Sequence, residues 1–411
     1  MAHPRPEQAG PRSTPAPERH AYGWFVAGLG SWFGAWGMQH VLFSWLVVGE
    51  LRENPASVGL AQMFQMLPAL GLMLFGGAIG DRLDRRRILL AAHAAAALAA
   101  LAMSHIVANG QLTYGIVIAY AVCWGTFQSF VLPARDAMLP DVAGSDLERG
   151  VTGMTLIQFS AQAVGSAAVR GAGVIGSAAA LGVQAAVAAL GLYPVSKLRL
   201  APPHGHRTAR PPILREIREG LREVWQSRAL RPLAGLVACN GVFFVGPYFV
   251  LYPLIVRDVY GADLGDLALV MMMFPVGMIA GSSLLLRRGG IRRKGRALLL
   301  GFVGGGLALI ATSLGLPFWG LLASVFGWGL AAAVFINMSR TLFQIWAPPS
   351  HRARVLSIYS LGLMGGAPLG NVAAGLLAEW LGPLPACALA GASMLAVIAF
   401  AWRFSEVRHM E

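Results

Sequence analysis

A short stretch at residues 77–87 combines carboxylates with a cluster of guanidinium groups. Asp81 is followed directly by Arg82, and Arg85 and Arg86 come shortly after. A carboxylate this close to several cations is expected to be ionised and to bind them through charge-assisted hydrogen bonds, which would tie neighbouring helix ends together. The alternative is a group of basic residues that only sets the orientation of the chain, with an incidental acid among them.

The apolar part of the sequence offers few groups that could carry a proton. All 19 Asp and Glu residues fall in a tail, in a loop or at the end of an apolar segment, and Glu379 is the closest to an exception. Imidazole titrates near neutral pH, so His40 is the first candidate proton carrier and His93 the second. The alternative for both is a neutral histidine that is hydrogen-bonded within a helical bundle.

Arg170 stands alone in an apolar segment. An arginine at the centre of a membrane-spanning helix costs roughly 2.5–3.5 kcal/mol on insertion scales, so its presence needs a reason. Near the end of its segment the side chain can extend to the membrane surface, which is the first reading. Attraction of an anionic solute is the second.

The sequence lacks the patterns of an enzyme or a metal site. It contains no HExxH or GxSxG motif, and no Ser/Lys or Asp/Asp pair within an apolar segment. Cys123, Cys239 and Cys387 lie in different apolar runs without the spacing of a metal site or a disulfide framework. We therefore expect a protein that is not an enzyme and that holds no metal and no cofactor.

The composition identifies the elements that must position these residues. Of the 411 residues, 56% are hydrophobic and only 12% are charged, against about 25% charged in soluble domains. Apolar runs long enough to cross a hydrocarbon core of about 30 Å recur throughout, which predicts an all-α membrane protein. We count twelve such segments, at residues 22–48, 57–80, 87–108, 111–132, 150–171, 174–197, 232–256, 264–286, 297–316, 318–341, 354–379 and 383–403.

The basic residues are distributed unevenly between the connections. With both termini on one side, 29 of the 32 Lys and Arg lie in the tails and in the connections on that side. The positive-inside rule then places both termini in the cytoplasm, and a plasma (inner) membrane location follows. Lys and Arg beside a membrane face anionic headgroups, so the net charge of +13 requires no nucleic acid.

A polar stretch, residues 198–231, divides the segments six and six. Its second part has apolar residues at helical spacing opposite charged ones, which predicts an amphipathic helix in the headgroup region; the alternative is a solvated linker helix. We therefore expect six-helix bundles at 22–197 and 232–403, with a disordered cytoplasmic tail at 1–21 and a second cytoplasmic tail at 404–411. The matching layout of the two bundles is typical of transporters whose halves rock around a central site.

The G-x-x-x-D-R-x-x-R-R spacing from Gly77 to Arg86 resembles the loop between helices two and three of the major facilitator superfamily. Asp84 stands where that motif usually has Gly, and this variant looks like the branch of transmembrane secretion effectors and enterobactin-exporter-like permeases. Pro133-Ala-Arg135 and Arg352-Ala-Arg354-Val355 agree with that branch. The resemblance covers residues 22–403.

Two further features depart from the family pattern. Gly165 is followed by Ser, where exporters of the superfamily often have a Gly-Pro pair, and the second copy of the loop, Gly281 to Arg296, has no acid. The resemblance still implies a conformational latch on the cytoplasmic side. Its residues here are Gly77, Asp81, Arg82, Arg85 and Arg86.

The resemblance also implies a substrate cavity lined by helices one, four, seven and ten. Few polar groups among large aromatic faces suit a bulky amphipathic organic solute; the alternative for each residue is packing between helices. The candidate substrate-binding residues on those segments are Trp36, Gln39, His40, Trp124, Gln128, Asn240, Phe244, Tyr248, Phe335 and Asn337.

Together these observations predict a monomeric twelve-helix permease of the lipid bilayer that works by alternating access and exports a small organic molecule. Protons are the candidate coupling ion, and His40 is the candidate carrier. One alternative is an importer of a small solute in the same fold. From a different class, a transport-inactive receptor or scaffold remains open.

Overall fold

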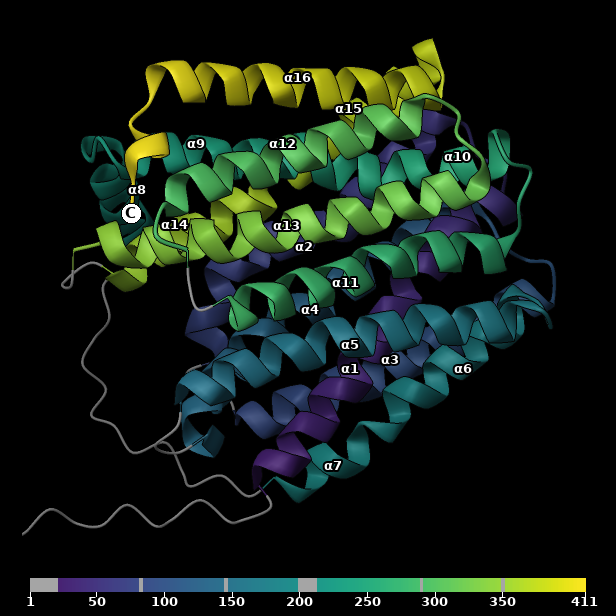
Figure 1. Ribbon diagram of the computed structural model, residues 1–411. Coiled ribbons are helices and arrows are strands. Elements are labelled where there is room, and N and C mark those ends of the chain that lie inside the picture. Colours follow the sequence, from purple (N-terminus) through teal and green to yellow (C-terminus); the bar gives the residue numbers. More distant parts are fainter. Residues whose placement is uncertain (1–20, 81–83, 144–146, 199–212, 289–290, 349–351) are drawn as a thin grey trace, which may run out of the picture.

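The computed structural model describes residues 21–80, 84–143, 147–198, 213–288, 291–348 and 352–411. Within these ranges the chain forms helices and no strand, so the predicted all-α class is confirmed (Figure 1). Of the two predicted tails, the first lies outside the described ranges as far as residue 20, whereas the second, residues 404–411, lies within them.

The first half of the chain forms a bundle that begins with α1 and ends with α7. Its elements are α1 Ala21–Trp45, continued by the π-helical turn η1 Leu46–Glu50, then α2 Pro55–Gly80, α3 Arg85–Ala108, α4 Tyr114–Ala143, α5 Leu147–Gly173, α6 Ser177–Leu190 and α7 Leu192–Lys197.

The second half follows an amphipathic helix, α8 Ile213–Gln226. Its first membrane helix is interrupted by two π-helical turns. The elements are α9 Leu230–Asn240, η2 Gly241–Val245, η3 Pro247–Leu251, α10 Tyr252–Asp258, α11 Leu264–Arg287, α12 Lys294–Ser313, α13 Phe318–Trp346, α14 Arg352–Gly365, α15 Ala367–Leu381, α16 Pro383–Phe404 and the short 3-10 turn η4 Val407–His409.

Helices occupy all the apolar segments that the sequence predicts, and nine stretches of the described part are long and apolar enough to cross a membrane. The apolar segment expected at 111–132 corresponds to the first part of a longer helix, α4, which continues to Ala143. Apolar composition marks only the part of a helix in hydrocarbon, so the polar turns beyond it were missed. Arg135 and Asp136 therefore lie within a helix.

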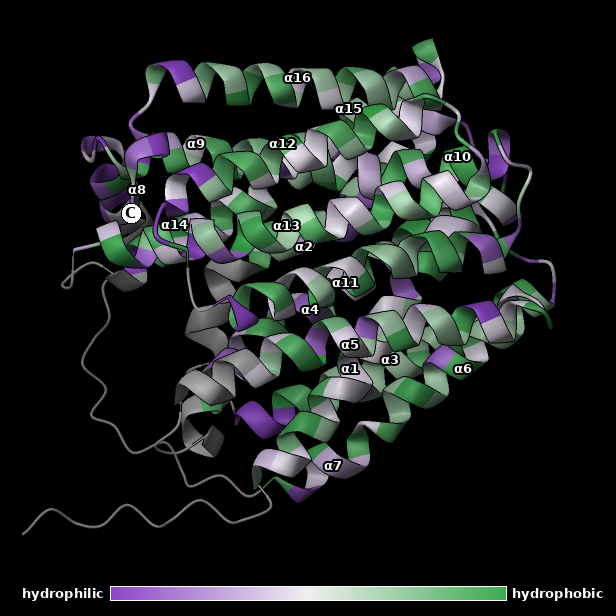
Figure 2. Cartoon of the chain, viewed as in Figure 1, coloured by the Kyte–Doolittle hydropathy of each residue, from purple (hydrophilic) through white to green (hydrophobic). Residues whose placement is uncertain are grey.

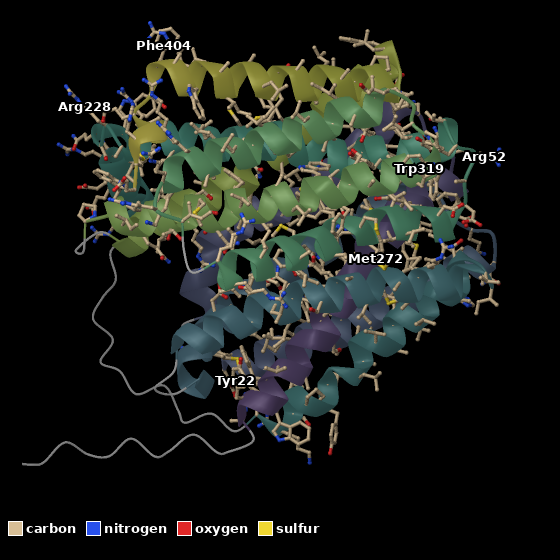
Figure 3. The ribbon with its side chains drawn as sticks, in the orientation of Figure 1. Tyr22, Arg52, Arg228, Met272, Trp319 and Phe404 are labelled. Carbon is tan, nitrogen blue, oxygen red and sulfur yellow. The ribbon has the colours of Figure 1, made fainter. Side chains whose placement is uncertain are left out.

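The bundle has two ends, which separate clearly in Figure 3. Tyr22, Arg228 and Phe404 lie at one end, called here the terminal end, because α1 begins and α16 ends there. Arg52 and Trp319 lie at the other, the distal end. Hydrophobic residues dominate between the ends, and hydrophilic residues gather at both of them (Figure 2).

Two connecting segments pack against the terminal end. On α8, Gly220 leaves room for the Arg354 carbonyl, and Glu219 forms an ion pair of 2.8 Å with Arg354 at the start of α14. After α16 the chain turns back, so that the Gly295 N–H donates to the Met410 carbonyl at 3.0 Å. The residues predicted as a second tail thus cap the start of α12.

Candidate functional site

At the distal end, charged side chains from each half bind the backbone of the other half. We call Arg170, Arg257 and Glu379 the distal clasp. Arg257 at the end of α10 donates to the carbonyls of Val48 and Glu53, at 2.9 and 3.3 Å. Glu379 on α15 accepts the Ala56 N–H at the start of α2, at 2.9 Å, where a helix leaves N–H groups unpaired and favours negative charge.

Arg170 completes the clasp on the opposite side of the interface. From α5 it donates to the Gly265 carbonyl at 3.2 Å and lies 3.6 Å from the Asp266 carboxylate, both at the start of α11. Neither of the two readings made from the sequence, extension to the membrane surface or attraction of an anionic solute, included this partner. A lone arginine in an apolar segment is thus accounted for by a contact between the halves.

Next to the clasp, on the side toward the terminal end, α2 and α15 cross at two glycines. A Cβ on Gly59 would lie 2.5 Å from the Asn371 carbonyl oxygen, and one on Gly375 would lie 2.6 Å from the Pro55 carbonyl oxygen. No side chain fits between the backbones at this depth. The crossing therefore closes the distal end of the interface on one side and brings Glu379, one turn after Gly375, over the start of α2.

The interface at mid-length is built around His40. Its ring lies between Trp36 of α1 and Phe249 of η3, with centroids 4.5 Å from each. Both ring nitrogens are buried and have no hydrogen-bond partner among the described residues. One turn further along α1, the Ser44 hydroxyl accepts from the Gln62 amide at 2.9 Å. The same amide donates to the Phe249 carbonyl at 3.1 Å and so joins α2 to the other half.

An aromatic cluster in the second half continues from Phe249. Tyr248 packs against Phe274 and Trp328 at ring distances of 5.0 and 5.7 Å, and its hydroxyl donates to the Met271 carbonyl at 2.8 Å. The neighbouring Met272 marks this level at mid-length of the bundle in Figure 3. His40 and Tyr248, two of the predicted binding residues, thus both contact Phe249, which the sequence analysis did not single out, and Trp36, a third, packs on the other side of His40.

Three other predicted binding residues make their described contacts within the first half. Gln39 is buried and accepts from the Tyr120 hydroxyl and the Gln184 amide, each at 2.8 Å. Gln128 accepts from the Trp32 indole at 3.0 Å, and Trp124 is buried beside the same indole. These contacts match the packing alternative.

The remaining predicted binding residues lie in the second half. Phe335 is buried against Phe302, with ring centroids 3.9 Å apart, and Phe244 packs on Phe302 as well. Asn337 is exposed and donates to the Ala333 carbonyl of its own helix at 2.8 Å. Asn240 is half-buried at the end of α9.

His93, the second candidate proton carrier, bonds inside the first half. Its Nδ1 lies 2.8 Å from the Leu89 carbonyl of its own helix, and its ring meets the edge of Trp32 at 5.2 Å. These contacts are those of the packed, hydrogen-bonded histidine that the alternative described.

The predicted latch is only partly described. Asp81 and Arg82 lie outside the described residues, and Gly77 is described only as part of α2. Asp84, the departure from the family motif, begins α3 by accepting the Arg86 N–H at 2.9 Å, which is a helix cap. The Arg86 guanidinium donates to the Ser196 carbonyl in α7, and Arg85 also has an interaction partner.

Sequence reasoning missed Arg135 as a candidate because it lay beyond the expected end of its segment. Its side chain is only 10% exposed, its guanidinium lies 5.4 Å from the Phe33 ring centroid, and it bonds to Asp136 at 2.7 Å and to Gln158 of α5 at 3.1 Å. Side chains on a helix lean toward its N-terminus, and α4 begins at the distal end. The guanidinium therefore lies deeper in the bundle than its own backbone.

The described residues include no group of three or more His, Cys, Asp or Glu side chains that could hold a metal ion. The charged side chains that the described residues place across the interface are those of the clasp and Asp266. At mid-length the two halves meet through aromatic faces and a few amide and imidazole groups, which are the kinds of group that line binding sites for organic molecules.

Known proteins similar to this chain are membrane transporters. The model of the family described as transmembrane secretion effector matches residues 14–411. The chain is 24% identical over 377 residues to macrolide efflux protein A of Streptococcus pyogenes, covering 89% of this chain and 92% of that one. It is 27% identical over 369 residues to the multidrug efflux pump Tap of Mycolicibacterium fortuitum, covering 84% and 86%.

Solved transporters have the same fold. A point mutant of the nucleoside transporter NupG superposes with a TM-score of 0.77 at 15% identity, covering 94% of this chain and all of that one. A bacterial homologue of the human lysosomal transporter Spinster, in an inward-facing and unoccupied conformation, superposes with a TM-score of 0.71 at 13% identity, covering 95% and 97%.

Proposed function

The chain belongs to the transmembrane secretion effector family of membrane transporters, and from that premise we propose that it exports a small amphipathic organic molecule by alternating access. The observation that carries the proposal is the interface between the halves. At the distal end the clasp forms hydrogen bonds between the two halves, and at mid-length the interface contains an aromatic site. The names of the two efflux relatives support the outward direction.

The distribution of basic residues supports an orientation. The terminal end faces the cytoplasm of a plasma (inner) membrane protein, because 29 of the 32 Lys and Arg lie on that side. The clasp is then the outer gate, which is shut in this conformation. Both halves of the site come from one chain, so a monomer is sufficient for transport. Asp81 and Arg82, with Arg85 and Arg86, act as the latch at the cytoplasmic end.

The central site consists of Trp36, His40, Tyr248 and Phe249. Large aromatic faces take up the apolar body of a solute, and a few polar groups fix its orientation. This composition favours an amphipathic organic molecule over a sugar or an inorganic ion, which would need many polar ligands. The internal partners of Gln39, Trp124 and Gln128 favour a supporting role for these three residues.

His40 is the proposed proton carrier. In the closed conformation its described ring contacts are with the uncharged Trp36 and Phe249. Neither ring nitrogen has a hydrogen-bond partner among the described residues, so a protonated imidazole would have two N–H groups without an acceptor. A proton would therefore be taken up when the outer gate opens and water reaches the ring. Its release after reclosure would couple inward proton movement to outward solute movement.

Transport by purified protein in liposomes tests the proposal. With inside-out orientation and a pH gradient, an amphipathic fluorescent dye should accumulate in vesicles that contain the protein and not in empty ones. Accumulation only with right-side-out orientation would support the importer. No flux in either orientation, with protein that binds the dye, would support a receptor.

A further inference from the structure

The Phe249 carbonyl lacks the donor that an α-helix would give it. In an α-helix this oxygen accepts from the N–H four residues later, but that residue is Pro253, which has no N–H. The Gln62 amide of the other half donates to the carbonyl instead, at 3.1 Å. A proline on one half thus creates an acceptor that a glutamine on the other half fills.

This contact fixes the orientation of the Gln62 side chain. A carbonyl can only accept, so the amide nitrogen must be the group that faces Phe249, and the same nitrogen reaches the Ser44 hydroxyl at 2.9 Å. Gln62 Oε1 is left buried without a donor among the described residues, on a side chain that is 1% exposed. A buried acceptor without a donor is costly, and in a native structure it calls for an explanation.

A second unpaired oxygen lies on the facing helix. Asn371 of α15 is fully buried, and its amide nitrogen approaches the Met66 sulfur of α2 at 3.5 Å. Its Oδ1 has no donor within the part of the chain that the structure describes. Met66 is one turn after Gln62, so the two amides belong to neighbouring turns of the same interface. We call Gln62, Asn371 and the Phe249 carbonyl the acceptor site.

Opening of the distal end would expose this set of acceptors. Separation of α2 from η3 breaks the Gln62–Phe249 hydrogen bond and leaves the carbonyl without its donor from the other half, beside the two amide oxygens. An ammonium group has only donors, and the adjacent faces of Trp36, Tyr248 and Phe249 attract cations. None of the described contacts of the acceptor site involves a charged side chain.

We infer that the acceptor site binds the N–H of a protonated amine on the transported solute as the distal end opens. The inference rests on the proposed function and narrows its solute to amphipathic organic amines. Gln62 and Asn371 are then binding residues on helices two and eleven. The family resemblance placed the cavity on helices one, four, seven and ten.

Two matched dyes test the inference by separating the N–H from the charge. One is a dansyl sulfonamide with a propyl-dimethylamine arm, protonated at neutral pH, and the other is its trimethylammonium analogue, which has the same charge and the same sulfonamide group but no N–H on its cationic nitrogen. Their dissociation constants are measured by dansyl fluorescence on the purified full chain in nanodiscs. The amine should bind on the order of tenfold more tightly, because a hydrogen bond to a charged group contributes enough free energy for a tenfold or larger difference in dissociation constant.

Gln62→Met keeps the length of the side chain and removes the oxygen, so the amine should lose its advantage over the quaternary dye. Pro253→Ala leaves Gln62 in place but gives Phe249 an α-helical donor, and it should reduce the advantage independently. Gln226→Met, at an exposed position at the end of α8, is the matched control and should keep it. Thermal unfolding and gel filtration confirm that each variant is folded.

Equal affinity of the wild type for both dyes would overturn the inference, as would an unchanged ratio in folded Gln62→Met. The transport assay reports separately on the proposed function. Export of both dyes with equal affinity rejects the amine site and keeps the exporter. A Gln62-dependent preference for the amine without any flux keeps the site and rejects the exporter.

Discussion

At the scale of single residues, His40 is the sharpest test of coupling. His40→Gln keeps a polar side chain of similar reach but cannot titrate, so proton-driven flux should fall about tenfold or more and lose its pH dependence, whereas dye binding should persist. Flux through reconstituted vesicles across a range of pH, with dye affinity measured on the same preparation, checks this.

His93→Gln is the matched control for this prediction, because that ring bonds inside the first half. It should leave the pH profile of transport in place. A His40→Gln protein with wild-type, pH-dependent flux would remove His40 from the mechanism and make Glu379 the next carboxyl group to test.

Arg135 is predicted to be a functional cation. Its side chain is only 10% exposed and reaches the Phe33 ring within the bundle, and a charged group enclosed in this way is a candidate for the transport path or a coupling site. Arg135→Lys keeps the charge but loses the planar fork that reaches Asp136 and Gln158 together. Transport should fall severalfold, with a loss of about 1–3 kcal/mol in unfolding free energy.

Dye flux and thermal unfolding of the Arg135→Lys protein measure these two effects. Arg287→Lys, an exposed cation at the terminal end of α11, serves as the control and should resemble the wild type in both. Normal flux in Arg135→Lys would assign Arg135 a purely structural role.

The candidate residues were predictable from sequence to different degrees. His40 could be found because it is a titratable side chain in a long apolar run that the resemblance assigns to the cavity. Gln62 could not, because an isolated glutamine gives no signal and its importance depends on Pro253, 191 positions away. Arg135 was missed because hydropathy ends the segment before it, although the helix continues.

At the scale of elements, the crossing of α2 and α15 should decide whether the distal end can close. A Cβ on Gly59 would already lie 2.5 Å from the Asn371 carbonyl oxygen, so Gly59→Leu must push the two helices apart. The variant should favour the conformation that is open at the distal end. An impermeant thiol reagent should then label a cysteine introduced at Val48 several times faster than in the wild type.

Gly115→Leu is the control for this prediction, since Gly115 lies at the same end of the bundle with open space around its Cβ position. It should not change the labelling rate. Slow labelling of Val48→Cys in a folded, membrane-inserted Gly59→Leu protein would show that the crossing does not control closure.

The helices themselves were well predicted, because membrane-length apolar runs have few alternatives to a helix. What the sequence could not show is which helix faces which. Glu379 was recognised as an unusual acid, yet its partner is the Ala56 N–H, 323 residues earlier, and a backbone group leaves no mark in a sequence. The same limit applies to Arg257, whose acceptors are two carbonyls.

At the scale of the whole molecule, the two halves are predicted to separate and rejoin at the distal end in every transport cycle. Ala56 and Glu379 lie on opposite halves and are in contact there. In a background without native cysteines, Ala56→Cys with Glu379→Cys can be joined by a short bis-methanethiosulfonate linker. The linker should stop dye flux almost completely, because the outer gate cannot open, and a reductant should restore it.

A second cysteine pair separates this effect from damage by the reagent. Ser57 and Tyr114 are also in contact at the distal end, where the Tyr114 hydroxyl donates to the Ser57 carbonyl at 2.8 Å, but both belong to the first half. Ser57→Cys with Tyr114→Cys should be linked equally well and continue to transport, because alternating access moves the halves as bodies and strains no contact inside one of them. Transport that persists after complete linkage of the Ala56 and Glu379 positions would mean that the distal clasp does not open in the cycle, and the site between the halves would then need another route to the outside.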